Sequence, residues 1–314
     1  MKITQVQTVN LRTILSETKR IVKANNTDFI ALYIFFLPLA FSLVITPTLH
    51  LHLSGSFFTV DLFHNSLANN QTLVTCHLLY ILIVYLLTLC AIGTIGYSTY
   101  NVFIGTPVNF FTSLKSLTFI FFPLVSTAII AHLVLLLISL TFLLFVGMIV
   151  MLGKSLGILV IDYNSIYFMW FSIATIIGII IYFHMNWCLV FMVVVAESKW
   201  GFAALMRSWY LVKGMRSVSL SLLLYNLICN GGMAWSFSYT VYFCAFRRET
   251  LSFVLLTMFG SIFLMLCLVM NTAANTVFYM YCKAFHGELE LEIGYGFNNH
   301  YINLPSSDDT VVGA

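Results

Sequence analysis

Residues 117–151 read LTFIFFPLVSTAIIAHLVLLLISLTFLLFVGMIVM and contain no charged side chain. A transmembrane helix needs about 20 consecutive apolar residues to cross roughly 30 Å of hydrocarbon. Because this stretch exceeds that length, it predicts a membrane-spanning helix. It is not isolated, since the 25 charged residues of the chain (14 Lys and Arg, 11 Asp and Glu) are clustered and leave five other long uncharged runs. The sequence therefore predicts a multi-pass integral membrane protein.

The overall composition supports the same class of protein. Of 314 residues, 61% are apolar and 8% are charged, whereas soluble domains are about 45–50% apolar and 25% charged. A net charge of +3 without a basic stripe argues against nucleic-acid binding. None of the seven cysteines forms a Cys-x-x-Cys pair, so we expect neither a zinc site nor a disulfide framework, and no cofactor.

We expect an all-α bundle of about six transmembrane helices. These lie at about 29–49, 73–97, 117–151, 165–196, 218–244 and 251–282. Residues 1–28 form a cytosolic amphipathic segment before this domain (29–285), and residues 286–314 form a polar cytosolic tail after it. As a helix, 165–196 would be about 51 Å long, and the sequence leaves open whether residues 188–196 project past the bilayer.

The distribution of basic residues predicts the orientation. Lys and Arg concentrate in cytoplasmic loops. With the N-terminus in the cytosol, 11 of the 14 Lys and Arg residues face the cytosol. The other three are Lys154, Arg247 and Arg248. We therefore expect both termini in the cytosol, with the protein in the endomembrane system or the plasma membrane.

The segment 197–214, ESKWGFAALMRSWYLVKG, is the most structured cytosolic element that the sequence predicts. We expect an interfacial helix over 198–214, ended by Gly214. The residues expected on its apolar face are Phe202, Leu205, Trp209 and Val212, and those expected to point away are Ala203, Ala204, Arg207 and Ser208. Such a helix is either an elbow between two spans or a surface for lipid headgroups or a protein partner.

The same segment carries a pattern that resembles a known family. The pattern consists of Asn186-Trp187, Glu197, Gly201, Ala204-Leu205, Arg207-Ser208 and Lys213-Gly214. It is similar to the signature of a broad family of uncharacterised multi-pass membrane proteins. Its plant branch shows stretches similar to 97–100, 105–110 and 278–283 of this chain.

Bacterial members of that family resemble the membrane domain attached to some glycerophosphodiester phosphodiesterases. The chain departs from them, because only about 30 residues follow the last predicted span and no catalytic domain is expected there. The resemblance therefore implies a six-helix membrane fold and no assigned activity.

Two pairs of asparagines lie inside the last two predicted spans. Asn226 and Asn230 are four residues apart in one span, and Asn271 and Asn275 are spaced likewise in the other. Because the spans are antiparallel, the four amides are expected at matching depths along one polar seam. Interhelical hydrogen bonds of this kind contribute about 0.6 kcal/mol each. The alternative is a polar path for a solute, aided by a helix break at 231–232.

Other candidate features are weaker. His132 and His184 are expected inside the membrane, each without a carboxylate at ligand spacing, and no Asp or Glu lies deep in a span, which argues against an ion-coupled pump. The chain lacks the phosphate-binding and hydrolase motifs, so we expect no enzymatic activity. In the tail, Tyr301 and Leu304 fit the Tyr-x-x-Φ pattern of a sorting signal.

Three functional hypotheses follow. The leading hypothesis is a non-enzymatic membrane protein with an interaction, scaffold or signalling role, whose partners are the lipid bilayer and membrane or cytosolic proteins. The second is a small-solute transporter or channel that uses the asparagine seam. The third is a membrane anchor for a lipid enzyme encoded elsewhere. A dry, closed seam would favour the first hypothesis over the second.

Overall fold

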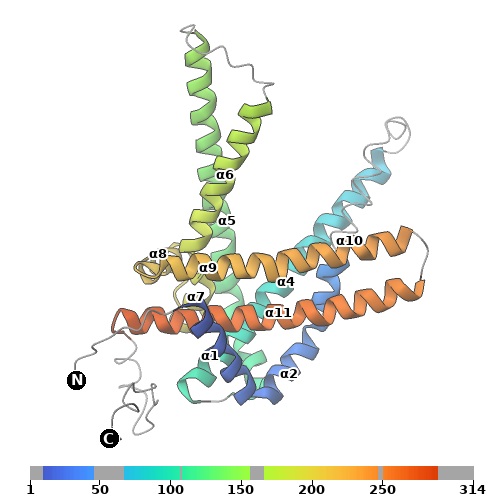
Figure 1. Cartoon of the computed structure of the whole chain (residues 1–314), viewed down its shortest axis with the longest axis vertical. Helices are drawn as coiled ribbons and strands as arrows, with labels where there is room; N and C mark the ends of the chain where they lie inside the picture. Colours follow the sequence, from blue (N-terminus) through green and yellow to red (C-terminus); the bar gives the residue numbers. More distant parts are fainter. Residues whose placement is uncertain (1–9, 46–66, 107, 156–165, 247–249, 289–314) are drawn as a thin grey trace, which may run out of the picture.

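The computed structural model describes residues 10–45, 67–106, 108–155, 166–246 and 250–288, and within these ranges it contains helices and no strands (Figure 1). The helices are α1 (Leu11–Ala24), α2 (Asn26–Phe35), a helix at Leu37–Ile45, α4 (Leu67–Ile104), α5 (Phe110–Ser155), α6 (Ile166–Asn186), α7 (Val190–Glu197), α8 (Phe202–Val212), α9 (Arg216–Asn226), the π-helical turn η2 (Leu227–Gly232), α10 (Met233–Phe246) and α11 (Thr250–Phe285). The predicted all-helical fold class is confirmed for the described residues.

Five helical stretches are long and apolar enough to span a membrane, and a bent pair of helices makes a sixth if it is counted as one span. The five are Thr75–Ile104, Phe110–Gly153, Ser172–Glu197, Arg216–Thr240 and Leu251–Phe285. They overlap the second to sixth spans predicted from the sequence. Several are longer than predicted, since α5 alone has 46 residues and a length of about 69 Å.

The first predicted span, 29–49, is not a single straight helix. It is divided between α2 and Leu37–Ile45, which are bent by 45° relative to one another, and residues 46–49 lie outside the described residues. The bend follows from Pro38. Its ring lacks an N–H and would clash with the carbonyl group four residues earlier in a continuous helix. The α2 helix therefore ends at Phe35, and a new helix begins at Leu37.

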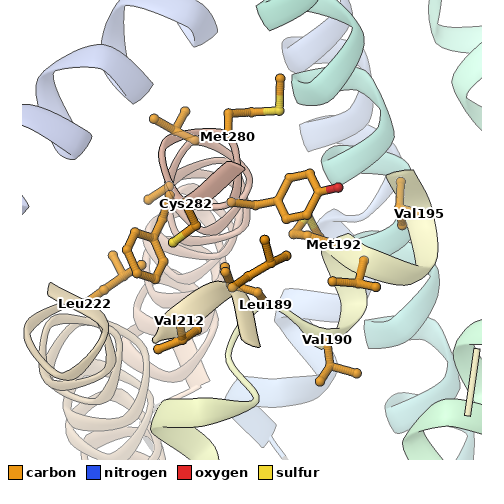
Figure 2. Packing of buried hydrophobic residues seen from close by; sticks show 14 of the residues in the cluster. Leu189, Val190, Met192, Val195, Val212, Leu222, Met280 and Cys282 are labelled. Atoms are coloured by element: carbon orange, nitrogen blue, oxygen red, sulfur yellow. The ribbon is translucent and has the colours of Figure 1, made fainter. Parts of the chain in front are cut away.

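Helix α7 lies within a large apolar core, and Figure 2 shows its Val190, Met192 and Val195 among buried side chains of other helices. A turn at 187–189 leads from α6 into α7, which contacts α4, α5, α8 and α11. Val190, Met192, Val193 and Val194 are all at most 3% exposed. Residues 188–196 therefore do not project beyond the rest of the protein. A helix that is apolar on all sides is stable when it is surrounded by others.

We call the core around α7 the hub. It joins buried side chains of six helices: Ile14 and Ile21 of α1, Leu124 of α5, Val190 to Val195 of α7, Leu205, Leu211 and Val212 of α8, Leu222 of α9, and Val277 to Met280 of α11. Helix α1 contributes an amphipathic face, since its buried residues Ile14, Thr18 and Ile21 recur at helical spacing. That face packs against α11, so the N-terminal segment is part of the core.

The long helices diverge from the hub. In Figure 1, α5 and α6 extend together in one direction and α10 and α11 extend together in another. Only 6% of the most apolar 18 residues of α5 are buried, against 33% for α4 and for α11. The predicted bundle is thus packed at the hub and at a second core, which α2 and Leu37–Ile45 form with α4 and α11. We call the parts of α5, α6, α10 and α11 that extend away from the hub the arms. They carry large exposed apolar side chains such as Phe119, Leu136 and Leu144 on α5, which are suited to contact with lipid.

The crossing of α4 over α7 depends on a small residue and generates a prediction. A Cβ atom at Gly96 would lie 2.7 Å from Cε of Met192, whose sulfur accepts a hydrogen bond from Thr276 at 2.9 Å. We expect Gly96→Val to lower the free energy of unfolding by about 1–3 kcal/mol through overpacking. The measurement is the thermal unfolding midpoint of the protein purified in detergent.

The matched control is Gly147→Val in α5, where a Cβ atom would have no other atom within 4 Å. Both variants replace a helical glycine by the same β-branched residue, so propensity effects cancel. Equal shifts of the unfolding midpoint in the two variants would show that α4 and α7 do not make this close contact.

Candidate functional site: a buried ion-pair network

The connection between α7 and α8 is a tight turn with unusual backbone angles. Ser198 has φ of 52°, and Gly201 has φ of 65° and ψ of −139°. The Gly201 conformation is accessible almost exclusively to glycine. The Gly201 N–H donates a hydrogen bond of 2.8 Å to the buried hydroxyl of Thr127 on α5. These features fix the start of α8 beside the end of α7.

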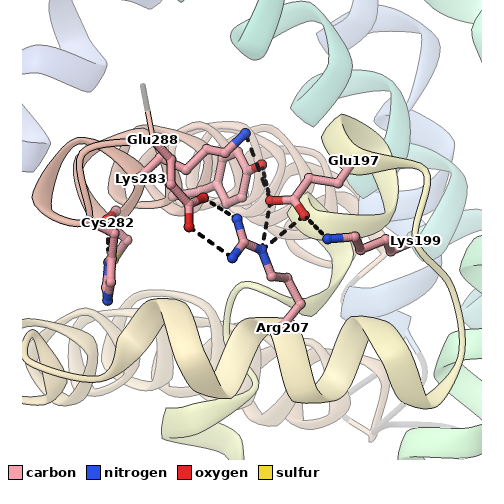
Figure 3. A network of polar contacts seen from close by, with 8 residues as sticks. Glu197, Lys199, Arg207, Cys282, Lys283 and Glu288 are labelled. Carbon is pink, nitrogen blue, oxygen red and sulfur yellow. Dashed lines mark hydrogen bonds and ion pairs between the residues drawn. The ribbon is translucent and has the colours of Figure 1, made fainter. Parts of the chain in front are cut away.

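The carboxylate of Glu197, the last residue of α7, is the centre of a polar network (Figure 3). Its Oε1 accepts a hydrogen bond from the Tyr279 hydroxyl at 3.0 Å, and its Oε2 accepts hydrogen bonds from Lys199 Nζ and Arg207 Nε, both at 3.0 Å. The Nζ atom of Lys283 lies 3.8 Å from Oε1. One carboxylate thus contacts the α7–α8 turn, α8 and α11.

Arg207 connects this carboxylate to a second one. While its Nε faces Glu197, its two terminal nitrogens donate to the two carboxylate oxygens of Glu288, one of them at 3.0 Å. The guanidinium carbon also lies 5.6 Å from the centre of the Tyr210 ring. Hydrogen bonding to Glu288 raises the pKa of Arg207 above its ordinary value, and hydrogen bonding from Arg207 lowers the pKa of Glu288. Both groups are charged at neutral pH.

The side chains of the network are buried at one end and more exposed at the other. The exposed fraction of the side chain is 6% for Lys283 and 9% for Glu197, and it rises to 18% for Arg207, 28% for Glu288 and 49% for Lys199. Charges buried to this degree are costly unless they are paired, which explains why Glu197 has so many partners. Three cations face two carboxylates, so these five residues carry a formal net charge of +1.

Ala204 and Ser208 place α8 against the end of α6. Both are fully buried, and the Ser208 hydroxyl donates to the main-chain oxygen of Asn186 at 2.9 Å. The Asn186 side chain donates to the Tyr182 carbonyl at 2.7 Å. The residues of the family-like pattern thus hold the two ends of the α6–α7–α8 segment together.

The structure divides the apolar face predicted for this helix. Leu205 and Val212 are buried in the hub and Phe202 is 59% exposed, while Ala204 and Ser208, predicted to point away from that face, are buried. The pairing of Arg207 with carboxylates from α7 and from the end of α11 orients α8. Small side chains at 204 and 208 then allow close contact, so hydrophobicity alone does not identify the buried face.

The other end of α8 also requires glycine. The helix ends at Val212, Lys213 is exposed, and Gly214 has φ of +100°. A Cβ atom at Gly214 would lie 2.8 Å from the Phe285 ring. The chain therefore turns back over the end of α11, next to the network.

The hydrogen bond found among the four asparagines of the predicted seam lies within one helical stretch. The side-chain amide of Asn230 donates to the Asn226 side-chain oxygen in the same helical stretch, and in the described residues no hydrogen bond joins this pair to Asn271 or Asn275. The side-chain oxygens of Asn230 and Asn271 are buried without a partner. The predicted break at 231–232 is absent, because those glycines belong to the π-helical turn η2 in an uninterrupted helix.

Several other candidates are placed outside the network. His132 hydrogen-bonds through Nδ1 to the Ala128 carbonyl at 2.7 Å. Over the described ranges, no group of three or more His, Cys, Asp or Glu side chains is arranged to hold a metal ion. Tyr301 and Leu304, the predicted sorting motif, lie outside the described residues.

Sequence reasoning missed three members of the network. Tyr279 and Lys283 lie four residues apart on α11, and that spacing places them on one helix face beside each other. Both fall in stretches quoted for the plant branch, but nothing connected them with Glu197. Glu288 was assigned to the polar tail, and its pairing with Arg207 depends on where α11 ends.

Over the residues that the structure describes, the fold is all-helical with five or six helices able to span a membrane, and five charged residues are joined beside the hub. The chain belongs to the family described as Domain of unknown function (DUF8558), which matches residues 2–291. No curated protein and no solved structure matches the chain. The family match includes the hub and every residue of the network.

The central position of Glu197 generates a prediction about stability. We expect Glu197→Gln to lower the free energy of unfolding by about 3 kcal/mol, because Arg207 and Lys283 would lose the charge that compensates their burial. Glu17→Gln is the matched control, since Glu17 pairs with Arg20, whose side chain is 73% exposed. The control should change stability by less than about 1 kcal/mol.

Both variants are measured by thermal unfolding in the same detergent. A Glu197→Gln shift no larger than that of Glu17→Gln would contradict the role of Glu197 in holding α7, α8 and α11 together.

The lowered pKa of Glu288 predicts a dependence on pH. Its contact with Arg207 contributes stability that is fully present above the ordinary glutamate pKa, about 4.3, and is lost as the pH falls through the lower pKa of the folded protein. We expect wild type and Glu288→Gln to differ by a constant amount in unfolding midpoint from about pH 7 to pH 5, and to converge below about pH 4. A difference between the two unfolding midpoints that grows as the pH falls would contradict this prediction.

Proposed function

We propose that this protein is a non-enzymatic multi-pass membrane protein with an interaction, scaffold or signalling role, in the endomembrane system or the plasma membrane and with both termini in the cytosol. The observation that carries the proposal is the saturation of Glu197. Each of its oxygens accepts a hydrogen bond from a residue of another part of the hub. A carboxylate used in this way stabilises an architecture and is not available as a catalytic base.

The outer side of α8 supports a role at the membrane surface. Phe202, Met206 and Tyr210 follow one another at four-residue spacing and are 59%, 59% and 50% exposed, and Trp200 before them is 60% exposed. The opposite side of the helix is buried in the hub. A helix with protein on one side and exposed aromatic side chains on the other is suited to the interfacial region of a bilayer. This is the surface that we assign to lipid headgroups or a protein partner.

The finer resemblance inferred from the sequence supports the same role. Asn186, Glu197 and Arg207 belong to the pattern shared with the plant branch and, more distantly, with the bacterial membrane domain attached to some glycerophosphodiester phosphodiesterases. In this chain these residues hold the hub together. A shared hub is consistent with a membrane module that serves other proteins, which includes an anchor for a lipid enzyme encoded elsewhere.

A small-solute transporter or channel is the second candidate, and one observation favours it. The side-chain oxygens of Asn230 and Asn271 are buried without a partner, which is costly in an apolar environment. They lie in and near the π-helical turn, a feature often found at functional sites. A polar solute or water would satisfy them.

One hollow among the described residues is apolar. It has a volume of about 340 Å³ and lies between the bent first pair of helices and α11. Its lining residues are Ile34, Leu37, Pro38, Phe41, Met258 and Ser261. None of the four asparagines lines it, and the preference for the scaffold proposal rests on the contacts of Glu197.

The scaffold and the transporter proposals predict opposite solvent accessibility for the four asparagine positions. In a variant whose seven cysteines are replaced by alanine, cysteine is introduced singly at positions 226, 230, 271 and 275 and treated with a membrane-impermeant maleimide. We expect all four positions to be protected, as for cysteine at the buried position Leu222, whereas the exposed position Lys213 reacts. Rapid labelling of the four positions would contradict the scaffold proposal and favour the transporter.

A further inference from the structure

The contact between Arg207 and Glu288 has the geometry of a site for a phosphate group. Two guanidinium nitrogens face two oxygens of one anion, which is the arrangement by which arginine binds carboxylates and phosphates alike. Glu288 comes from the last described turn after α11, where its N–H is bonded to the Lys283 carbonyl at 3.0 Å. The anion in this site is thus supplied by the chain itself.

The charges around Arg207 suit an anion of higher charge than a carboxylate. Glu197 neutralises one of the three cations, so withdrawal of Glu288 would leave Arg207, Lys199 and Lys283 with a net charge of +2. A phosphate monoester carries a charge of about −1.5 to −2 at pH 7. The side chains of Arg207 and Glu288 are 18% and 28% exposed, so an anion in place of Glu288 would be reached from outside the protein.

The surroundings of Arg207 favour a lipid as the source of the phosphate. On α8, Arg207 lies directly beside Met206, and its guanidinium lies against the ring of Tyr210, so it borders the exposed apolar side of that helix. A side of this kind is expected to enter the bilayer interface, where headgroup phosphates are located.

We propose that Arg207, supported by the buried charge of Lys283, forms a binding site for the terminal phosphate monoester of an anionic lipid, and that Glu288 occupies this site as a tethered competitor. The proposal rests on the proposed function, since it specifies the ligand of the α8 surface. Lipid binding and docking of Glu288 exclude one another. The site therefore couples the composition of the membrane to the position of the segment that follows α11.

The test is a titration of the purified full chain in a non-ionic detergent with phosphatidic acid, read by native mass spectrometry. We expect Glu288→Gln to bind phosphatidic acid about tenfold more tightly than wild type, because the competing charge is removed. Arg207→Gln should weaken binding about tenfold relative to wild type. Lys213→Gln, which removes an exposed cation at the end of the same helix, should leave the affinity unchanged.

Further measurements identify the ligand. Phosphatidylglycerol, a phosphodiester with one negative charge, should not distinguish Glu288→Gln from wild type. Inorganic phosphate should not displace phosphatidic acid at comparable concentration, and if it does, the site belongs to a soluble phosphate and the lipid source is overturned. Arg207→Lys keeps the charge but not the two-pronged contact, so it should bind more weakly than wild type while it unfolds at a similar temperature.

Equal affinities of wild type, Glu288→Gln and Lys213→Gln would overturn the proposal, as would an Arg207→Lys variant with unchanged affinity. These outcomes are independent of the maleimide experiment. A scaffold without this site would keep the asparagine positions protected and show no effect of Glu288→Gln on lipid affinity. A transporter would label at those positions whatever the lipid result.

Discussion

A carboxylate at the edge of an apolar core is stable only if it is surrounded by cations and hydrogen-bond donors, and in this protein Glu197 imposes that requirement on three helices. Arg207 meets it from α8, Tyr279 and Lys283 meet it from α11, and Lys199 meets it from the turn between α7 and α8. Each of these contacts depends on the position of the element that provides it. The packing of α7, α8 and α11 and the pairing of their charges therefore depend on each other, because the same contacts of Glu197 require both.

The hub and the arms follow different physical rules. In the hub, side chains are excluded from any solvent, and small residues such as Gly96 and Ala204 permit helices to approach closely. In the arms, helices such as α5 expose most of their apolar surface. Lipid does not drive apolar surfaces together as water does, so contacts between membrane helices depend on fit and on hydrogen bonds.

Much of the fold could be predicted from the sequence, because a long uncharged run has few interpretations other than a span. The stretch 117–151 and four others correspond to helices able to cross a membrane. The bend before Pro38 and the burial of α7 are harder to predict from the sequence. A span predicted by length says nothing about whether its final residues are surrounded by protein or by lipid.

The site was predictable only in outline. The pattern from Asn186 to Gly214 marked the right segment, because residues such as Gly201 and Gly214 have conformations that few other residues adopt. The partners from α11 were missed, since their proximity to Glu197 depends on the three-dimensional path of the chain. For the asparagines, regular spacing predicts a contact between helices, and the hydrogen bond that the structure gives joins Asn226 and Asn230 within one helical stretch.

The packing of α1 against α11 has a consequence for biosynthesis. These two helices lie at opposite ends of the described chain, yet Ile14 and Ile21 share one core with Phe278 and Tyr279. Contacts between such distant residues form late, because everything between them must be made first. The buried face of α1 therefore has no final partner until α11 has been synthesised. Among the described helices, α11 is the one that completes the core.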